Sequence, residues 1–245
     1  MSELLKTQAI VLKKLDYGDT SRIIQFFTDD FGKISAMLKG ARSPKSKLGL
    51  IVDTFNYVQI VMYKKDTRDV QLVSEVDLLN HFVNIKEDYT RIKFASALIE
   101  LLSNMTVENE HHHKMFTGSV KALELMNDNN LNPKLIFAKY FLFFIKEIGY
   151  EFQLSNCSIC GNNIPPTNPV AFNYETGILC SDYRQERLTN LELSKELFNL
   201  LQCLRIKNNE FVVDENNLDK IITLLEKFLK TNIHEFKGLK SLELI

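Results

Sequence analysis

The sequence predicts an α+β protein, with a small five-stranded β barrel at the N-terminus followed by a helical domain. Three observations lead to this prediction. The first 80 residues contain five short apolar segments separated by turn signals, several of which contain glycine. After about residue 82, apolar residues recur at helical spacing. Three of the four cysteines fall in one irregular stretch, residues 153–187, which interrupts the helical pattern.

The composition is that of a globular protein. The chain has 245 residues, of which 45% are hydrophobic and 25% charged, and this balance excludes a wholly disordered chain. A net charge of −1 excludes a globally basic nucleic-acid binder but allows a local basic patch. No apolar run approaches the ~20 residues of a membrane span, and the N-terminus lacks a signal-peptide layout. We therefore expect a cytoplasmic protein that makes no membrane contact.

The five expected strands have the length and turn chemistry of a closed barrel. They cover residues 7–15, 21–28, 33–39, 55–63 and 70–79. Side chains alternate between the two faces of a strand, so the fourth strand can be divided into an inner and an outer set. The inner set is Asn56, Val58, Ile60 and Met62. The outer set, which carries three aromatic rings, is Phe55, Tyr57, Gln59, Val61 and Tyr63.

Helices are expected over residues 92–102, 116–126, 133–148, 191–204 and 218–229. Pro133 is suited to open the third helix and Gly149 to end it. That helix is apolar on most sides, which is typical of a core helix, although it could also form the floor of a groove for a partner peptide. Its aromatic residues are Phe137, Tyr140, Phe141, Phe143 and Phe144. The predicted division of the chain is 1–80, 81–152, 153–187 and 188–245.

A basic loop is the first candidate site. Residues 31–52 contain no acidic side chain and five cations: Lys33, Lys39, Arg42, Lys45 and Lys47. Phosphate backbones attract such clusters, and outward aromatic rings on a nearby strand would let unstacked bases lie flat against them. We predict phosphate contacts for Lys39, Arg42, Lys45 and Lys47, and base stacking for Tyr57 and Tyr63. The alternative is a solvated loop, with the aromatic rings buried against the helical domain.

These residues resemble the RecO family of bacterial recombination mediators. The resemblance is carried by Tyr17-Gly18-Asp19-Thr20-Ser21, Phe27-Thr28, Gly32-Lys33 and residues 39–46, and its layout extends along the whole chain. It implies an N-terminal OB fold that binds single- and double-stranded DNA. It also implies annealing of strands coated by single-strand-binding protein, loading of RecA together with RecR, and docking of the acidic C-terminal tail of single-strand-binding protein on the helical domain. The implied location is the cytoplasm, at the nucleoid during repair.

The resemblance implies no covalent chemistry and no nucleotide cofactor, so we expect no enzyme. The chain agrees, because it has no GxxxxGK[ST] phosphate-binding loop. Two alternatives remain open. One is an adaptor whose OB fold binds a partner protein and has no annealing activity. The other is a metal-dependent enzyme built on three cysteines. Candidate cations for the rim of the tail-docking site are Arg91, Lys93, Lys121, Lys139 and Lys146.

The cysteine spacing is the second candidate site. Cys157-Ser-Ile-Cys160 is followed after 19 residues by Cys180-Ser-Asp-Tyr183, which matches a four-cysteine zinc site except that Tyr183 holds the last position. The surrounding residues resemble the zinc-ribbon module of many RecO-like proteins. Bound zinc would need a fourth ligand from Asp182, Tyr183, water or a distant residue. The alternative is a degenerate, metal-free module packed through Ile159, Phe172 and Leu179.

Two further features are expected to be structural. Cys203 lies among leucines on a predicted helix and resembles a small buried hydrophobe. Consecutive histidines cannot all face one metal ion from a helix, so His111, His112 and His113 are expected to form a solvated connection between helices.

Overall fold

The computed structural model describes residues 3–43, 46–65, 67–151, 154–164, 170–183, 189–205 and 214–243. The chain forms two compact units, one of residues 1–133 together with 240–245 and the other of residues 134–239. The finer division predicted from the sequence, with boundaries after residues 80, 152 and 187, stays a prediction. None of the described helices is long and apolar enough to span a lipid bilayer.

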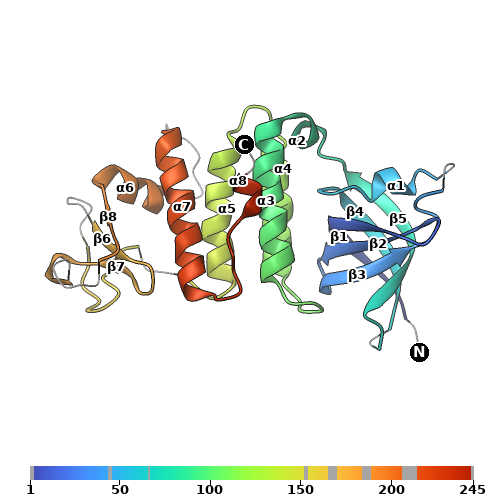
Figure 1. The fold of residues 1–245 in the computed structure, drawn as a ribbon, viewed down its shortest axis with the longest axis horizontal. Helices are drawn as coiled ribbons and strands as arrows, with labels where there is room; N and C mark the ends of the chain where they lie inside the picture. Colours follow the sequence, from blue (N-terminus) through green and yellow to red (C-terminus); the bar gives the residue numbers. More distant parts are fainter. Residues whose placement is uncertain are drawn as a thin grey trace. The chain divides into compact units, whose positions relative to one another are not determined.

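The first unit begins with the predicted five-stranded barrel (Figure 1). Its strands follow the order β1-β2-β3-β5-β4, and β4 pairs back onto β1 to close the cylinder. Their bounds are β1 Glu3–Tyr17, β2 Ser21–Thr28, β3 Gly32–Leu38, β4 Tyr57–Lys64 and β5 Val70–Asn80. One short helix, α1 Leu48–Ile51, lies between β3 and β4. The predicted fold class is confirmed.

The strands close because every second side chain can fill the interior. On β4, Val58, Ile60 and Met62 are fully buried, as the alternation of this strand predicts. They join inward residues of the other strands in one apolar cluster, which includes Val11, Ile24, Phe26, Ile34, Ala36 and Val73. The expected alternation fails at Phe55, which is 8% exposed and precedes the strand in a left-handed conformation (φ 74°). Phe55 is therefore a buried turn residue, and the expectation that it faces outward was wrong.

The helices of the first unit are α2 Val83–Glu87, α3 Tyr89–Met105, α4 His113–Met126 and the C-terminal α8 Lys240–Glu243. Asp88 begins α3 by accepting a hydrogen bond from the backbone N–H of Arg91 (2.8 Å). α4 covers part of the barrel, because the Phe116 ring lies 6.3 Å from the rings of both Phe27 and Tyr57. The Glu100 carboxylate accepts hydrogen bonds from the backbone of α8, so this segment is fixed to α3.

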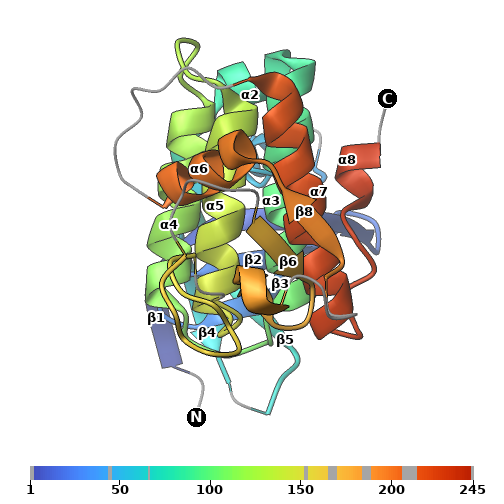
Figure 2. The same ribbon diagram turned by 90° about the vertical axis from the view of Figure 1, so that its left-hand side faces the viewer.

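The second unit contains α5 from Lys134 onward, a three-stranded sheet, and two further helices (Figure 2). The elements are α5 Pro133–Glu147, β6 Val170–Asn173, β7 Gly177–Leu179, the 3₁₀ helix η1 Ser181–Tyr183, β8 Leu191–Leu193, α6 Lys195–Leu204 and α7 Glu215–Asn232. The sheet order is β7-β6-β8. The helix expected from residue 191 was wrong over its first three residues, which pair with β6. The helix starts only after Ser194, whose hydroxyl caps it.

A polar network fixes the chain where it leaves the barrel. Asp53 accepts hydrogen bonds from Lys14 of β1 and from Lys86 of α2 (3.0 Å for Lys86). Lys86 also donates to Asn56 Oδ1 (2.6 Å), and the fully buried Asn56 amide donates to two backbone carbonyls of α1. Burial opposes ionisation of Asp53, but the two lysines outweigh it and lower the pKa of the carboxyl.

Replacing Asp53 with Asn should destabilise the first unit in a pH-dependent way. A carboxyl whose pKa is lowered by folding contributes stability above its unfolded pKa of about 3.9, and this contribution disappears as the pH falls through the folded value. Because Asp53 is about one-third exposed, we expect a loss of about 1 kcal/mol or less at pH 7. Urea unfolding of both proteins from pH 7 to pH 3 measures it. A difference that persists undiminished at pH 3 would contradict this origin.

Candidate nucleic-acid interface and metal centre

The basic loop leaves β3 through a tight turn. Gly40 takes a positive φ of 72°, and the backbone N–H of Ser43 donates to its carbonyl (3.1 Å). Lys39 and Lys47 are exposed on either side of this turn, and neither forms an ion pair within the described part of the chain. Lys45 lies outside the described residues. Lys39 and Lys47 are therefore the predicted phosphate contacts whose charge is fully available.

Arg42 is exposed but has partners within the protein. Its guanidinium lies 3.3 Å from Asp16 Oδ2 and donates to the Gly18 carbonyl (2.9 Å). Asp16 also accepts from Arg22 Nε (2.9 Å), and this hydrogen bond, helped by the charge of Arg42, lowers the pKa of the Asp16 carboxyl. Asp16 thus holds Arg42 against the β1–β2 turn and offsets part of its positive charge. The sequence did not reveal this partner, because Asp16 lies 26 residues before Arg42.

Lys33, the remaining cation of the segment, does not belong to the loop surface. Its side chain is 8% exposed, and Nζ donates to the Ser103 carbonyl of α3 (2.6 Å). Burial lowers the pKa of this ammonium group. Lys33 therefore connects β3 with α3 and was wrongly grouped with the cations of the loop.

The two tyrosines predicted to stack on bases differ in exposure. Tyr57 is half-buried, its ring faces Phe116 of α4, and its hydroxyl bonds to Gln8 Oε1. Tyr63 is 40% exposed near the other end of β4. Stacking stays a prediction for both, and Tyr63 offers the larger free ring surface.

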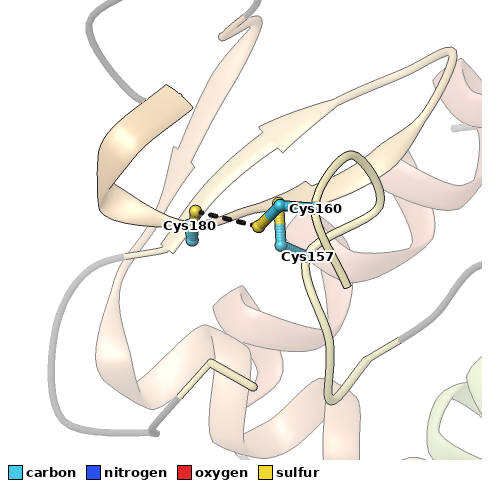
Figure 3. Close-up of side chains that lie close together, drawn as sticks. All are labelled: Cys157, Cys160 and Cys180. Atoms are coloured by element: carbon cyan, nitrogen blue, oxygen red, sulfur yellow. Dashed lines mark hydrogen bonds between the residues drawn. The ribbon is translucent and has the colours of Figure 1, made fainter. Parts of the chain in front are cut away.

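Three cysteine thiols gather in the second unit (Figure 3). Cys157 and Cys160 come from the loop before β6, and Cys180 directly follows β7. Their sulfur atoms all lie within 4.8 Å of one another, and Cys160 Sγ is 3.7 Å from Cys180 Sγ. A tetrahedral zinc ion with ligands at 2.3 Å would separate its sulfurs by about 3.8 Å. The three thiols can therefore bind one metal ion.

The environment favours a thiolate at Cys157. Burial opposes ionisation, but backbone N–H groups of Cys160, Cys180 and Ile159 point at the sulfur and lower the pKa of Cys157 to about 7. Burial and the neighbouring thiols raise the pKa of Cys180, because one negative charge disfavours a second. A cation among the three sulfurs would remove this repulsion.

The structure leaves the fourth ligand open. Tyr183 lies in η1, where its backbone N–H donates to the Cys180 carbonyl (3.2 Å). Among the described residues, no histidine, aspartate or glutamate lies close enough to the three sulfurs to complete the site, and Asp182 is therefore not the fourth ligand in this structure. Cys203, on α6, does not join them either and is half-buried.

The histidine run lies at the surface before α4, as expected: His111 and His113 are exposed and His112 is half-buried. His113 begins α4, and its Nδ1 lies 2.6 Å from Asp29 Oδ1 in the β2–β3 turn. His112 lies 3.6 Å from Glu110. His113 therefore contacts the barrel as well as joining helices.

A pocket of about 230 Å³ lies beside α5 in the second unit. Its apolar lining includes Phe143, Leu154 and Leu204, while Lys139, Lys146 and Arg205 supply positive charge. Lys139 and Lys146 are two of the rim cations predicted from the sequence. Residues distant in sequence complete the pocket, which is why the sequence could not locate it.

Arg91, another rim candidate, is 7% exposed. Its guanidinium donates to backbone carbonyls that follow α4, among them Asp128 (2.8 Å) and Asn129 (3.2 Å). Arg91 therefore stabilises the end of a helix and is not available to a peptide.

Comparison with known proteins matches both parts of the chain to one family. Residues 1–82 match the model described as recombination protein O N terminal, and residues 86–243 match the model described as recombination protein O C terminal. The chain belongs to the RecO family. Its relatives include the DNA repair protein RecO of Pelodictyon phaeoclathratiforme, 26% identical over 99% of this chain and 97% of that protein. The RecO of Prosthecochloris aestuarii is 35% identical over 66% of this chain and 62% of that protein.

The match to the RecO family makes this chain a DNA repair protein with an N-terminal OB fold. It confirms the resemblance carried by the sequence. The three described cysteines lie close enough together to hold one metal ion.

Zinc content tests the cysteine cluster. We expect roughly one zinc ion per chain in protein purified without chelator, and less zinc together with a lower Tm in Cys160→Ser. Cys203→Ser is the matched control, because this thiol lies outside the cluster, and it should retain the metal. Inductively coupled plasma mass spectrometry measures the zinc content, and thermal unfolding measures the Tm. Equal zinc content in wild type and Cys160→Ser would contradict the assignment.

Proposed function

We propose that this RecO-family protein binds single- and double-stranded DNA and anneals complementary strands coated by single-strand-binding protein. With RecR it helps load RecA onto such DNA. These steps require no covalent chemistry, because holding, aligning and releasing strands is sufficient. Work on chromosomal DNA would place the protein in the bacterial cytoplasm, at the nucleoid during repair.

The observation that carries the proposal is the exposed basic loop on a closed barrel. Lys39 and Lys47 are accessible and unpaired among the described residues, so they can exchange solvent for phosphate. Arg42 is exposed and oriented by Asp16, so it can meet a phosphate with little loss of side-chain entropy.

A partner-binding adaptor is the second candidate. In that case the OB fold would contact a protein, and DNA would bind only through nonspecific attraction. Annealing of coated strands at ~0.15 M salt separates the two functions, because exposed charges further apart than about 8 Å are largely screened there. Acceleration supports the mediator. No acceleration by folded protein that still binds RecR would favour the adaptor.

Reversing the charges of Lys39 and Lys47 should weaken DNA binding, because it removes electrostatic attraction to the phosphates. Each lost phosphate contact lowers the dependence of log Kobs on log salt by about 0.7 for a single strand, so Lys39→Glu/Lys47→Glu should flatten the slope by about 1.4. Fluorescence anisotropy across a salt series measures this change, and annealing of coated strands should slow in parallel.

Lys114→Glu is the matched control for the loop variant. It reverses one exposed charge on α4, outside the loop, and should leave the salt slope and the annealing rate close to wild type. An unchanged salt slope in the loop variant would contradict the proposal that Lys39 and Lys47 contact DNA phosphates.

We also propose that the pocket beside α5 receives the acidic, hydrophobic-ended tail of single-strand-binding protein. Phe143 and Leu154 offer an apolar floor for the hydrophobic end of the tail. Lys139 and Lys146 line the same pocket and can pair with the acidic residues next to that end. Glu151 occupies the same rim, 3.4 Å from Lys146 and 2.6 Å from Arg205. An acidic tail would have to compete with this carboxylate.

Two substitutions at the pocket should act in opposite directions. Glu151→Gln frees Lys146 and Arg205 and removes a negative charge, so binding of the tail peptide should tighten about two- to fivefold. Lys146→Glu should weaken it by a similar or larger factor, and Lys195→Glu, an exposed lysine of α6 outside the pocket, should leave it unchanged. Titration calorimetry with the tail peptide measures all three. Weaker binding to Glu151→Gln would contradict this location.

A further inference from the structure

The outer surface of the barrel carries a row of apolar side chains that passes through all five strands. Each member pairs directly with the next across neighbouring strands: Leu4 with Tyr63, Tyr63 with Leu72, Leu72 with Met37, Met37 with Ile23, and Ile23 with Leu15. Directly opposed residues of paired strands point to the same face. The outer row is therefore Leu4, Tyr63, Leu72, Met37, Ile23 and Leu15.

The outward direction of the row follows from its neighbours along the chain. Ile24, Met62 and Val73, each adjacent to a row member, lie in the barrel core. Successive side chains of a strand point to opposite faces, so Ile23, Tyr63 and Leu72 must face out.

The row remains accessible. Leu15 is 59%, Leu4 57% and Tyr63 40% exposed, and the other three members are partly exposed. The helices of this unit contact the barrel through residues outside the row: Phe27 and Tyr57 lie against α4 and Lys33 against α3. Residues of α3 and α8 also come close to β1 around Leu12 and Lys13, near the Leu15 end of the row. A contiguous apolar surface of this kind is uncommon unless something binds there.

Positive charge borders the row on both sides. On one side, Lys39 follows Met37 and Lys6 follows Leu4, each by two residues, and both are exposed. On the other side, Lys65 follows Tyr63 and Lys13 precedes Leu15 by the same spacing, and both are again exposed. Lys13 also lines a pocket together with residues of α3 and α8. None of these four lysines forms an ion pair within the described ranges. The acidic residues Glu75 and Asp77 follow Leu72 on β5, on the same side of the row as Lys39 but three and five residues away from the row along the strand.

We propose that the outer row is a platform for the unstacked bases of single-stranded DNA, with the bordering lysines on the phosphates. This inference rests on the proposed function and assigns base contact to Ile23, Met37 and Leu72 in addition to Tyr63. Bases present flat apolar faces and the backbone presents regularly spaced negative charge, so an apolar strip between cations complements both. An apolar protein partner would gain nothing from the four free lysines.

The test separates base contact from phosphate contact. The probes are a mixed-sequence 30-mer and an abasic 30-mer with the same number of phosphates. Wild type should bind the base-bearing strand about tenfold more tightly. Ile23→Thr/Met37→Thr/Leu72→Thr should lose about tenfold on that strand and nothing on the abasic one, with an unchanged salt slope. Threonine keeps the strand propensity of these positions, and circular dichroism with thermal unfolding checks the fold.

Leu79→Thr is the matched control, because Leu79 is a 44% exposed apolar residue of β5 outside the row. It should bind both probes as wild type does. Equal wild-type affinity for the two 30-mers would overturn the platform and leave DNA binding by the loop intact. Full affinity in the triple variant would also overturn it and assign the row to a protein partner. Binding of neither probe, even at low salt, would remove the proposed DNA binding itself.

Discussion

Closure of the barrel through the parallel pairing of β3 with β5 determines which side chains of the first unit reach solvent. The register from Ser35 opposite Val70 to Leu38 opposite Val73 joins the two edges of an antiparallel sheet, β3-β2-β1-β4-β5, that would otherwise remain open. Once the cylinder is closed, one half of each strand's side chains must fill the interior and the other half must face out. The inner half forms a tightly packed apolar cluster, so a one-residue slip in register would expose it. The outer row and the start of the basic loop therefore have fixed positions.

The charges of the first unit fall into two groups with different roles. Lys33, Lys86 and Arg91 are largely buried, and each donates to partners from elements distant in sequence. An unpaired charge in such a position would cost several kcal/mol, so these cations are committed to the fold. Lys39 and Lys47 have no such partners among the described residues and retain their charge for a ligand. Arg42 lies between the two groups, because Asp16 orients it without burying it.

The sequence predicted local structure well where a single period governed it. The alternation of β4 and the helical spacing of α3 each follow from one stretch of chain, and both were predicted with small errors at the ends. The errors arose where a distant partner decided the outcome. Leu191 became a strand residue because β6 offered an open edge, and Phe55 turned inward because the chain bends before β4. Applying the same alternation to β2, β3 and β5 would have identified Ile23, Met37 and Leu72, but only the pairing register shows that they form one row.

The proposed combination of loop and row suits annealing better than tight storage of single strands. A protein that anneals strands must hold a strand by its phosphates while allowing its bases to leave for a complement. Stacking on aromatic rings is worth about 1–3 kcal/mol per base and would oppose that transfer. The outer row has one aromatic ring, Tyr63, and otherwise aliphatic side chains and the methionine Met37, none of which offers a flat ring for stacking on a base. Contacts of this kind keep a strand extended and unpaired but release each base readily when a complementary base competes for it.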